Sequence, residues 1–130
     1  MKKSILLCML LVCGMYGWCA QRITFTVEGP EETYNQIRIV NETATAEFRC
    51  RITRLNADGE PGEVYGVYTL KAAGDTDTKT SKVRNGEQFV LDMPNDFPTE
   101  VGYAIEYVDL PLFDMVVIHL IEANEFDPLQ

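Results

Sequence analysis

The chain has 130 residues, of which 46% are hydrophobic and 24% charged, and its formal net charge is −9. This composition is typical of a globular protein and excludes collagen-like, low-complexity and disordered chains. The acidic excess opposes binding to nucleic-acid phosphates and to anionic lipid. We therefore expect one domain that does not bind nucleic acid.

Residues 1–20 have the features of a secretory signal peptide. Two lysines follow the first methionine, an apolar stretch covers 5–12, and the segment ends in Ala20 before Gln21. A membrane-spanning helix needs about 20 mainly apolar residues, whereas glycines interrupt this stretch. We predict cleavage after Ala20 and export of residues 21–130, with no transmembrane segment, to the periplasm, the cell surface or the medium.

A lipoprotein signal is the alternative reading of this segment. It requires a small residue before the lipidated cysteine, but Cys8, Cys13 and Cys19 each follow a bulky residue. The short lysine-led start is typical of bacteria, and the Ala20-Gln21 junction resembles those of exported proteins from Bacteroidetes. This resemblance covers a few residues and implies nothing about activity.

The mature chain is more acidic than the precursor and has a single cysteine. Cleavage removes two lysines and no acidic residue, so the formal charge changes from −9 to −11. Cys50 has no partner for an intramolecular disulfide, although compartments outside the cytoplasm are oxidising. Packing must therefore stabilise the domain, and a chain of this size buries roughly two thirds of its unfolded surface.

Alternation of apolar and polar residues predicts an all-β chain, and no segment keeps a helical period. In the clearest strand, Ala46, Phe48, Cys50 and Ile52 share one face, which places the thiol in the core. We expect a type I′ hairpin at Asn85-Gly86. The predicted strands are 23–28, 36–40, 45–55, 64–72, 79–84, 87–92, a strand beginning at 103–107, and 113–121.

The last third of the chain carries a family resemblance. The sequence L-D-M-P-N-D-F-P-T-E-V-G-Y-A-I-E-Y-V over 91–108 has a strand, a proline-containing corner, a tyrosine and alternate apolar residues. It resembles the end of an immunoglobulin or fibronectin type III domain. The resemblance implies an antiparallel β-sandwich of about seven to eight strands over 21–130, with Tyr103 as a corner tyrosine.

The mature chain departs from antibody domains because it lacks tryptophan and paired cysteines. A small closed barrel and a jelly-roll-like module are the competing architectures, since both have short strands with evenly spaced turns.

The side chains that could carry catalysis are few. The mature chain has one histidine, His119, one serine, Ser81, and one cysteine, Cys50. Alternation points Cys50 away from its arginine neighbours, and Ser81 lacks the G-x-S-x-G turn of a serine nucleophile. His119 lies in a strand that is apolar on both faces, which favours a packing role in a central strand. We predict no catalytic residue and no cofactor.

Asp75 and Asp77 are the candidate metal ligands. Two carboxylates on one side of an extended segment, with loop carbonyls, could form the oxygen cage that calcium prefers. The same residues are also good turn formers. Because no calcium-loop motif and no third acid accompany them, we expect a turn and no metal.

Two further motifs concern the surface. The turn at 109–113 carries Leu110, Leu112 and Phe113, which makes these residues candidates for partner binding; the alternative is that the turn folds back over the sandwich. Asn41-Glu42-Thr43 spells an N-glycosylation acceptor, which has meaning only in a eukaryotic protein.

Two hypotheses of function follow. The first is a non-catalytic binding or assembly module of the bacterial cell envelope, with a protein or glycan partner. The second is a small secreted hydrolase or metal-dependent enzyme that uses His119 with Cys50 or with Asp75 and Asp77. The positions of His119 and Cys50 separate the two, because a dyad needs both side chains within hydrogen-bond reach.

Overall fold

The computed structural model describes residues 2–8, 21–98, 100–111 and 113–122, with the backbone alone at 2–8 and 113. These residues form strands and loops and no helix, which confirms the prediction of an all-β chain. The strands are β1 Lys2–Cys8, β2 Arg22–Thr26, β3 Thr33–Asn41, β4 Phe48–Leu55, β5 Pro61–Leu70, β6 Thr76–Arg84, β7 Gln88–Asp92, β8 Val101–Leu110 and β9 Phe113–Glu122. The eight strands that follow residue 20 are those that alternation predicts, with shifted ends.

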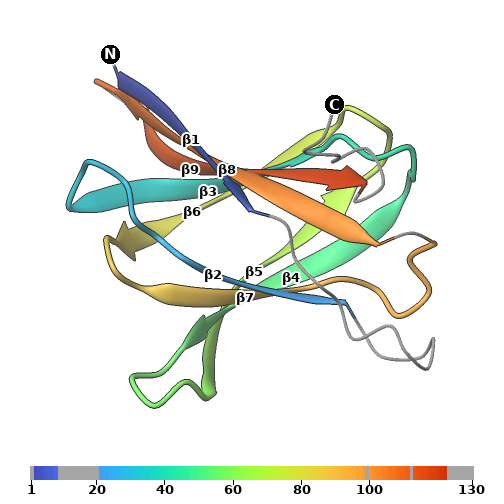
Figure 1. Cartoon of the computed structure of the whole chain (residues 1–130), viewed down its shortest axis with the longest axis horizontal. Coiled ribbons are helices and arrows are strands. Elements are labelled where there is room, and N and C mark those ends of the chain that lie inside the picture. Colours follow the sequence, from blue (N-terminus) through green and yellow to red (C-terminus); the bar gives the residue numbers. More distant parts are fainter. Residues whose placement is uncertain (1, 9–20, 99, 112, 123–130) are drawn as a thin grey trace.

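The strands form two sheets that pack face to face as a β-sandwich (Figure 1). Sheet A has the order β1-β8-β9-β3-β6, and sheet B has the order β2-β7-β4-β5. Strands β3 and β9 run parallel, and the other paired strands run antiparallel. The side chains between the sheets form one apolar core.

Period-two alternation places the core residues of β4 as predicted, with one exception. Phe48, Cys50 and Ile52 are buried, and Arg49 between them is exposed. Ala46 is exposed, against the prediction, because Glu47 has a φ of 55° and interrupts the extended backbone before β4 begins.

The predicted hairpin at Asn85-Gly86 is wrong. Strand β6 belongs to sheet A and β7 to sheet B, so this turn carries the chain from one sheet to the other. Gly86 has a φ of 92°, and Asn85 is not among the residues with positive φ, whereas a type I′ turn needs two. Contacts with the segment after β2 hold the turn: the Gly29 N–H donates to Asn85 Oδ1 at 2.9 Å.

A proline-containing crossing also connects β7 to β8 and changes sheets. Phe97 lies in this crossing and packs edge-on against Phe48, with 4.8 Å between ring centroids. Tyr103 is buried in the core, and its corner role stays a prediction. The hydroxyl of Tyr34 has the corner geometry, because it accepts the N–H of Glu31 at 2.9 Å, three residues upstream.

Candidate functional site

Cys50 lies in the core between the sheets. Its side chain belongs to the buried apolar cluster, and only 3% of the residue is exposed. Burial raises the pKa of the thiol from 9.0 to about 12, and the negative charge of Asp77 adds to the effect. A thiol that stays protonated and enclosed is a poor nucleophile and a poor metal ligand.

Asp75 and Asp77 bind backbone N–H groups of β5. Asp77 Oδ2 accepts the N–H of Thr69, and Asp75 Oδ2 accepts the N–H of Lys71, each at 2.9 Å. These donors lie on β5, at the edge of sheet B, or directly after it, so the two carboxylates satisfy groups that the sheet leaves unpaired. In the described residues, no group of three or more His, Cys, Asp or Glu side chains is arranged to hold a metal ion.

Asn41 of the glycosylation motif is fully buried. Its side-chain amide donates to the carbonyls of Thr45 and Ala72, and its Oδ1 accepts from the N–H and the hydroxyl of Thr43. The asparagine therefore fixes the loop after β3 and is enclosed in the fold.

His119 lies on the outer face of sheet A, in the central strand β9. Its neighbours Ile118 and Leu120 are fully buried in the core, so alternation turns the imidazole to the other face of the sheet. Nε2 lies 2.9 Å from Oε1 of Glu106 on β8, and Nδ1 contacts Oε2 of Glu42, directly after β3. The expected central position of this strand is confirmed.

The two carboxylates lie on opposite sides of the imidazole ring, because each contacts a different nitrogen. A neutral imidazole carries one N–H, so hydrogen bonds to both glutamates require one additional proton in the cluster. This arrangement links β3, β8 and β9 across the sheet. Glu106 is only 7% exposed, and the contact with His119 compensates part of the cost of its burial.

The structure does not bring His119 together with Cys50. The cysteine lies between the sheets and the imidazole lies on the outer face of sheet A, so sheet A separates them. Asp77, for its part, accepts the N–H of Thr69 on β5 of the opposite sheet, and Asp75 accepts the N–H of Lys71 directly after β5. The residues of the enzyme hypothesis thus occupy separate positions in the fold.

Sequence reasoning missed the partners of His119. A signal for one of them was present: Glu106 and His119 each interrupt an apolar run, in two strands that are adjacent in the chain. Two such residues on one face of a hairpin are expected to pair. Glu42 lies 77 positions from His119, and no local pattern identifies it.

The three arginines of β4, which are Arg49, Arg51 and Arg54, lie in two environments. Arg49 and Arg51 are exposed on the outer face of sheet B, where Arg51 and Arg22 both approach Asp92. Arg54 instead lies at the edge of the sandwich, with a side chain only 21% exposed.

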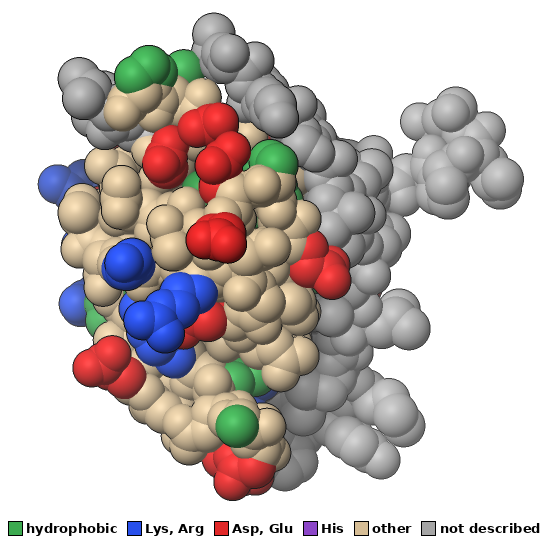
Figure 2. All heavy atoms as spheres, turned by 90° about the vertical axis from the view of Figure 1, so that its left-hand side faces the viewer, with side chains coloured by type: hydrophobic (Ala, Val, Ile, Leu, Met, Phe, Trp, Pro, Cys, Tyr) green, Lys and Arg blue, Asp and Glu red, His purple; other side chains and the backbone are tan. Residues whose placement is uncertain are grey.

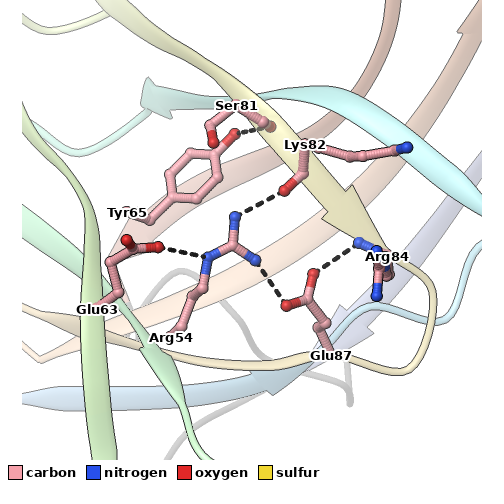
Figure 3. Close-up of polar contacts among 7 residues, drawn as sticks. All are labelled: Arg54, Glu63, Tyr65, Ser81, Lys82, Arg84 and Glu87. Atoms are coloured by element: carbon pink, nitrogen blue, oxygen red, sulfur yellow. Dashed lines mark hydrogen bonds and ion pairs between the residues drawn. The ribbon is translucent and has the colours of Figure 1, made fainter.

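Arg54 joins the two sheets at this edge (Figure 3). Its Nη1 donates to Glu87 at 2.6 Å, and its Nη2 donates to the carbonyl of Lys82 on β6 at 2.7 Å. Its guanidinium carbon lies 5.4 Å from the ring centroid of Tyr65 and 5.5 Å from that of Phe89. A planar cation with five donors suits this combination of hydrogen bonds and ring contacts.

Tyr65 also joins sheet B to β6 of sheet A. Its hydroxyl donates to the carbonyl of Ser81 at 2.6 Å and lies 3.3 Å from the carbonyl of Lys79. Side chains of sheet B thereby occupy carbonyls of the β6 edge, while Asp77 of β6 occupies an N–H of the β5 edge. These contacts close the seam between the two edge strands, β5 of sheet B and β6 of sheet A. Neither edge is then open for pairing with another strand.

The predicted binding turn lies at the end of the β8–β9 hairpin. Leu110 ends β8 opposite Phe113, and it is partly buried. Leu112 and the side chain of Phe113 lie outside the described residues, so their role stays a prediction. Asp109 and Asp114 are directly opposite each other beside this turn. Burial raises the pKa of Asp114, and the neighbouring carboxyl of Asp109 raises it further.

The face at the left of Figure 1 carries both basic and acidic side chains (Figure 2). Lysine and arginine side chains gather near its centre with acidic side chains around them, and hydrophobic side chains appear only as separate spots in the described part. This part of the surface has no broad apolar patch of the kind that marks a protein interface.

Comparisons with protein-family models, with curated proteins and with solved structures find no match to the chain. In the part of the chain that the structure describes, no helix has the length and apolar character needed to cross a membrane.

Proposed function

We propose that the protein is a non-catalytic binding or assembly module of the bacterial cell envelope, which acts after export as residues 21–130. The observation that carries the proposal is the structural use of the side chains best suited to chemistry. The thiol of Cys50 is enclosed, the carboxylates of Asp75 and Asp77 bind backbone amides, and His119 is occupied by two glutamates.

We further propose that the sandwich is a variant of the immunoglobulin-like class. Strand β3 pairs with β6 in one sheet while β4 pairs with β7 in the other, an interlocked arrangement that supports this assignment. The outer strands differ, because β2 lies beside β7, and β8 and β9 extend the sheet that contains β3.

The turn that contains Leu110, Leu112 and Phe113 is the proposed docking element. It connects β8 and β9, which have ten residues each, and apolar residues at a turn favour contact with a partner. A protein of the envelope is the partner that we propose, because the net charge of −11 after cleavage opposes association with anionic lipid.

Cross-linking in cells tests the proposal. The full gene is expressed in an exporting bacterium, the protein is cross-linked in place, and bound proteins are identified by mass spectrometry. We expect one envelope protein to be recovered with the wild type and at least five-fold less with Leu112→Asp or Phe113→Asp. Val64→Asp on exposed β5 is the matched control and should not reduce recovery.

Two results would contradict the proposal at different levels. Absence of any specific cross-linked protein would remove the binding function. Recovery that neither turn variant changes, with circular dichroism showing native folds, would remove the turn as the docking site. Hydrolysis of ester, peptide or glycoside substrates that His119→Gln abolishes would favour the enzyme hypothesis instead.

A further inference from the structure

The edge of sheet A at β8 differs from the other edges of the sandwich. Strands β5 and β6 close each other through the contacts of Arg54, Tyr65 and Asp77. Strand β2 has only five residues, and short edge strands resist pairing with other chains. Strand β8 has ten residues, and in the full chain β1 pairs with seven of them.

Strand β1 lies entirely within the predicted signal peptide (Figure 1). It pairs antiparallel with β8 in continuous register, from Lys2 opposite Asp109 to Cys8 opposite Tyr103. Cleavage after Ala20 would remove this strand and leave the backbone groups on one side of β8 without a strand partner. An uncovered row of backbone donors and acceptors is a template for another strand.

The domain is anchored directly after the cleavage site. The N–H of Val101, at the start of β8, donates to the side chain of Gln21 at 2.9 Å, and the N–H of Met93 donates to the carbonyl of Gln21. These contacts fix the predicted new terminus between the two sheets. Removal of residues 1–20 therefore leaves both ends of the β7–β8 crossing in place.

We infer that β8 of the processed protein accepts an extended strand from a protein partner in the envelope, and that this strand is apolar with lysine or arginine at its N-terminal end. The inference rests on the proposed function and names the surface and the partner's chemistry. In the chain itself, the strand that occupies this edge has the sequence K-K-S-I-L-L-C.

The charge at the end of β8 supports a basic residue in the partner. Asp109 and Asp114 are directly opposite each other. Like charges at directly opposed positions destabilise a strand pair. Lys2 of β1 lies in register with Asp109, so a partner strand with the same spacing would bring a basic residue to the position opposite Asp109. A second copy of the chain would bring a net charge of −11 and the acidic residues of its own β8 to the same edge.

A peptide tests the edge directly. The exported protein is purified from the envelope, and intact mass determines whether it begins at Gln21. The probe is a synthetic peptide of residues 2–8 with Cys8→Ser, and the control peptide has proline in place of Leu6. We expect the probe to slow hydrogen exchange of alternate amides in 101–110 at least five-fold, without change in 22–26. The proline peptide should bind at least ten-fold more weakly, because proline cannot donate in the ladder.

Two pairs of variants locate the binding. Val108→Lys on β8 should weaken binding of the probe at least ten-fold, whereas Val64→Lys on the β5 edge should leave it unchanged, since a lysine blocks strand addition where it stands. Asp109→Asn should weaken binding and reduce its dependence on salt, and the exposed Asp96→Asn should do neither. Asp109→Asn should also raise the thermal stability of the free protein, which shows that the variant folds.

Several results would overturn the inference. These are retention of residues 1–20 in the exported protein, equal binding of both peptides, and protection outside β8. A dimer of the processed protein that Val108→Lys converts to a monomer would make a second copy the occupant. An envelope partner whose cross-linking is unchanged by Val108→Lys would leave the proposed function standing and refute the edge. Binding of the probe at β8 without any cross-linked partner would support the edge and count against the proposed function.

Discussion

Nε2 of His119 lies 2.9 Å from the carboxylate of Glu106, which is only 7% exposed on the outer face of sheet A. The pair joins β8 to β9 at diagonal positions of the hairpin, since Ala104 is opposite His119 and Val117 is opposite Glu106. A charge at this depth is costly without a partner. The contact therefore contributes to the stability of the same hairpin whose outer strand we infer to be the docking edge.

His119→Ala is expected to lower the free energy of unfolding by about 1–3 kcal/mol, because it leaves Glu106 without one of its contacts. Urea unfolding at neutral pH measures the change. His119→Gln keeps one donor and should cost less. Combining His119→Ala with Glu106→Gln should restore part of the loss, as expected for coupled neighbours. Additive losses would mean that the two residues do not interact in solution.

Alkaline pH should destabilise the fold through the buried thiol. Burial raises the pKa of Cys50 from 9.0 to about 12, so the folded state keeps a proton that the unfolded state has lost between these values. Stability from this group is complete below pH 9 and falls as the pH rises toward 12, by at most about 1.4 kcal/mol for each pH unit. Burial also raises the pKa of Tyr65 to about 12 and adds to the fall above pH 10.

Cys50→Ala separates the thiol from the tyrosine. At pH 7 we expect a loss of about 1 kcal/mol from the small cavity. The difference from wild type should then shrink between pH 9 and 11, because the variant has no thiol to deprotonate. Unfolding in urea across this range measures both effects. In the folded wild type the thiol should also resist alkylation at pH 8 and react rapidly once unfolded, and rapid labelling of the folded protein would contradict its burial.

Arg54 is expected to be the arginine whose replacement costs most. Arg54→Met should lower the free energy of unfolding by about 2–3 kcal/mol, because Glu87 and the carbonyl of Lys82 lose charged donors. Arg54→Lys keeps the charge but loses the planar fork, so it should still cost about 1 kcal/mol or more. Arg49→Lys, on the exposed face of β4, is the control and should change stability by less than about 0.5 kcal/mol. Equal effects at the two positions would argue against the closed seam.

The sequence predicted the strands well because burial on one face imposes a period of two on residues such as Phe48, Cys50 and Ile52. It did not predict which strands pair. Asn85-Gly86 has the composition of a hairpin turn, but β3 takes β6 as its partner and β4 takes β7. Strand pairing depends on contacts between distant segments, which a local pattern does not contain.

For the candidate sites, too, local patterns predicted the positions of single residues but not the contacts between distant segments. The inward position of Cys50 followed from alternation. The turn expected at Asp75 and Asp77 is wrong for Asp77, which lies in strand β6. The role of Arg54 depends on β6, which lies about 28 residues away in the chain. The edge of β8 depends on its pairing with β1, and the signal pattern of residues 1–20 predicts removal without indicating which strand β1 covers.

Gly29 is the glycine at which a side chain should be least tolerated. A Cβ there would lie 2.2 Å from the hydroxyl of Tyr34 and 2.5 Å from the ring of Tyr107. Both rings are buried, 5.5 Å apart, and each hydroxyl accepts a backbone N–H, from Glu31 and Glu28 respectively. The rings therefore cannot move aside without losing these bonds. Gly29→Ala should cost about 2–3 kcal/mol through overpacking.

Gly74→Ala is the matched control for this last prediction. Gly74 has a φ of 85° and open space around its Cβ position, so alanine there adds backbone strain of about 1–2 kcal/mol without a clash. Tyr34→Phe removes the atom nearest to the new methyl group at Gly29. The combined variant Gly29→Ala and Tyr34→Phe should therefore lose less stability than the two single losses together, whereas Gly74→Ala and Tyr34→Phe should be additive. Thermal and urea unfolding of the three single and two combined variants test this difference, and additivity in both pairs would show that the tyrosine rings yield to the methyl group.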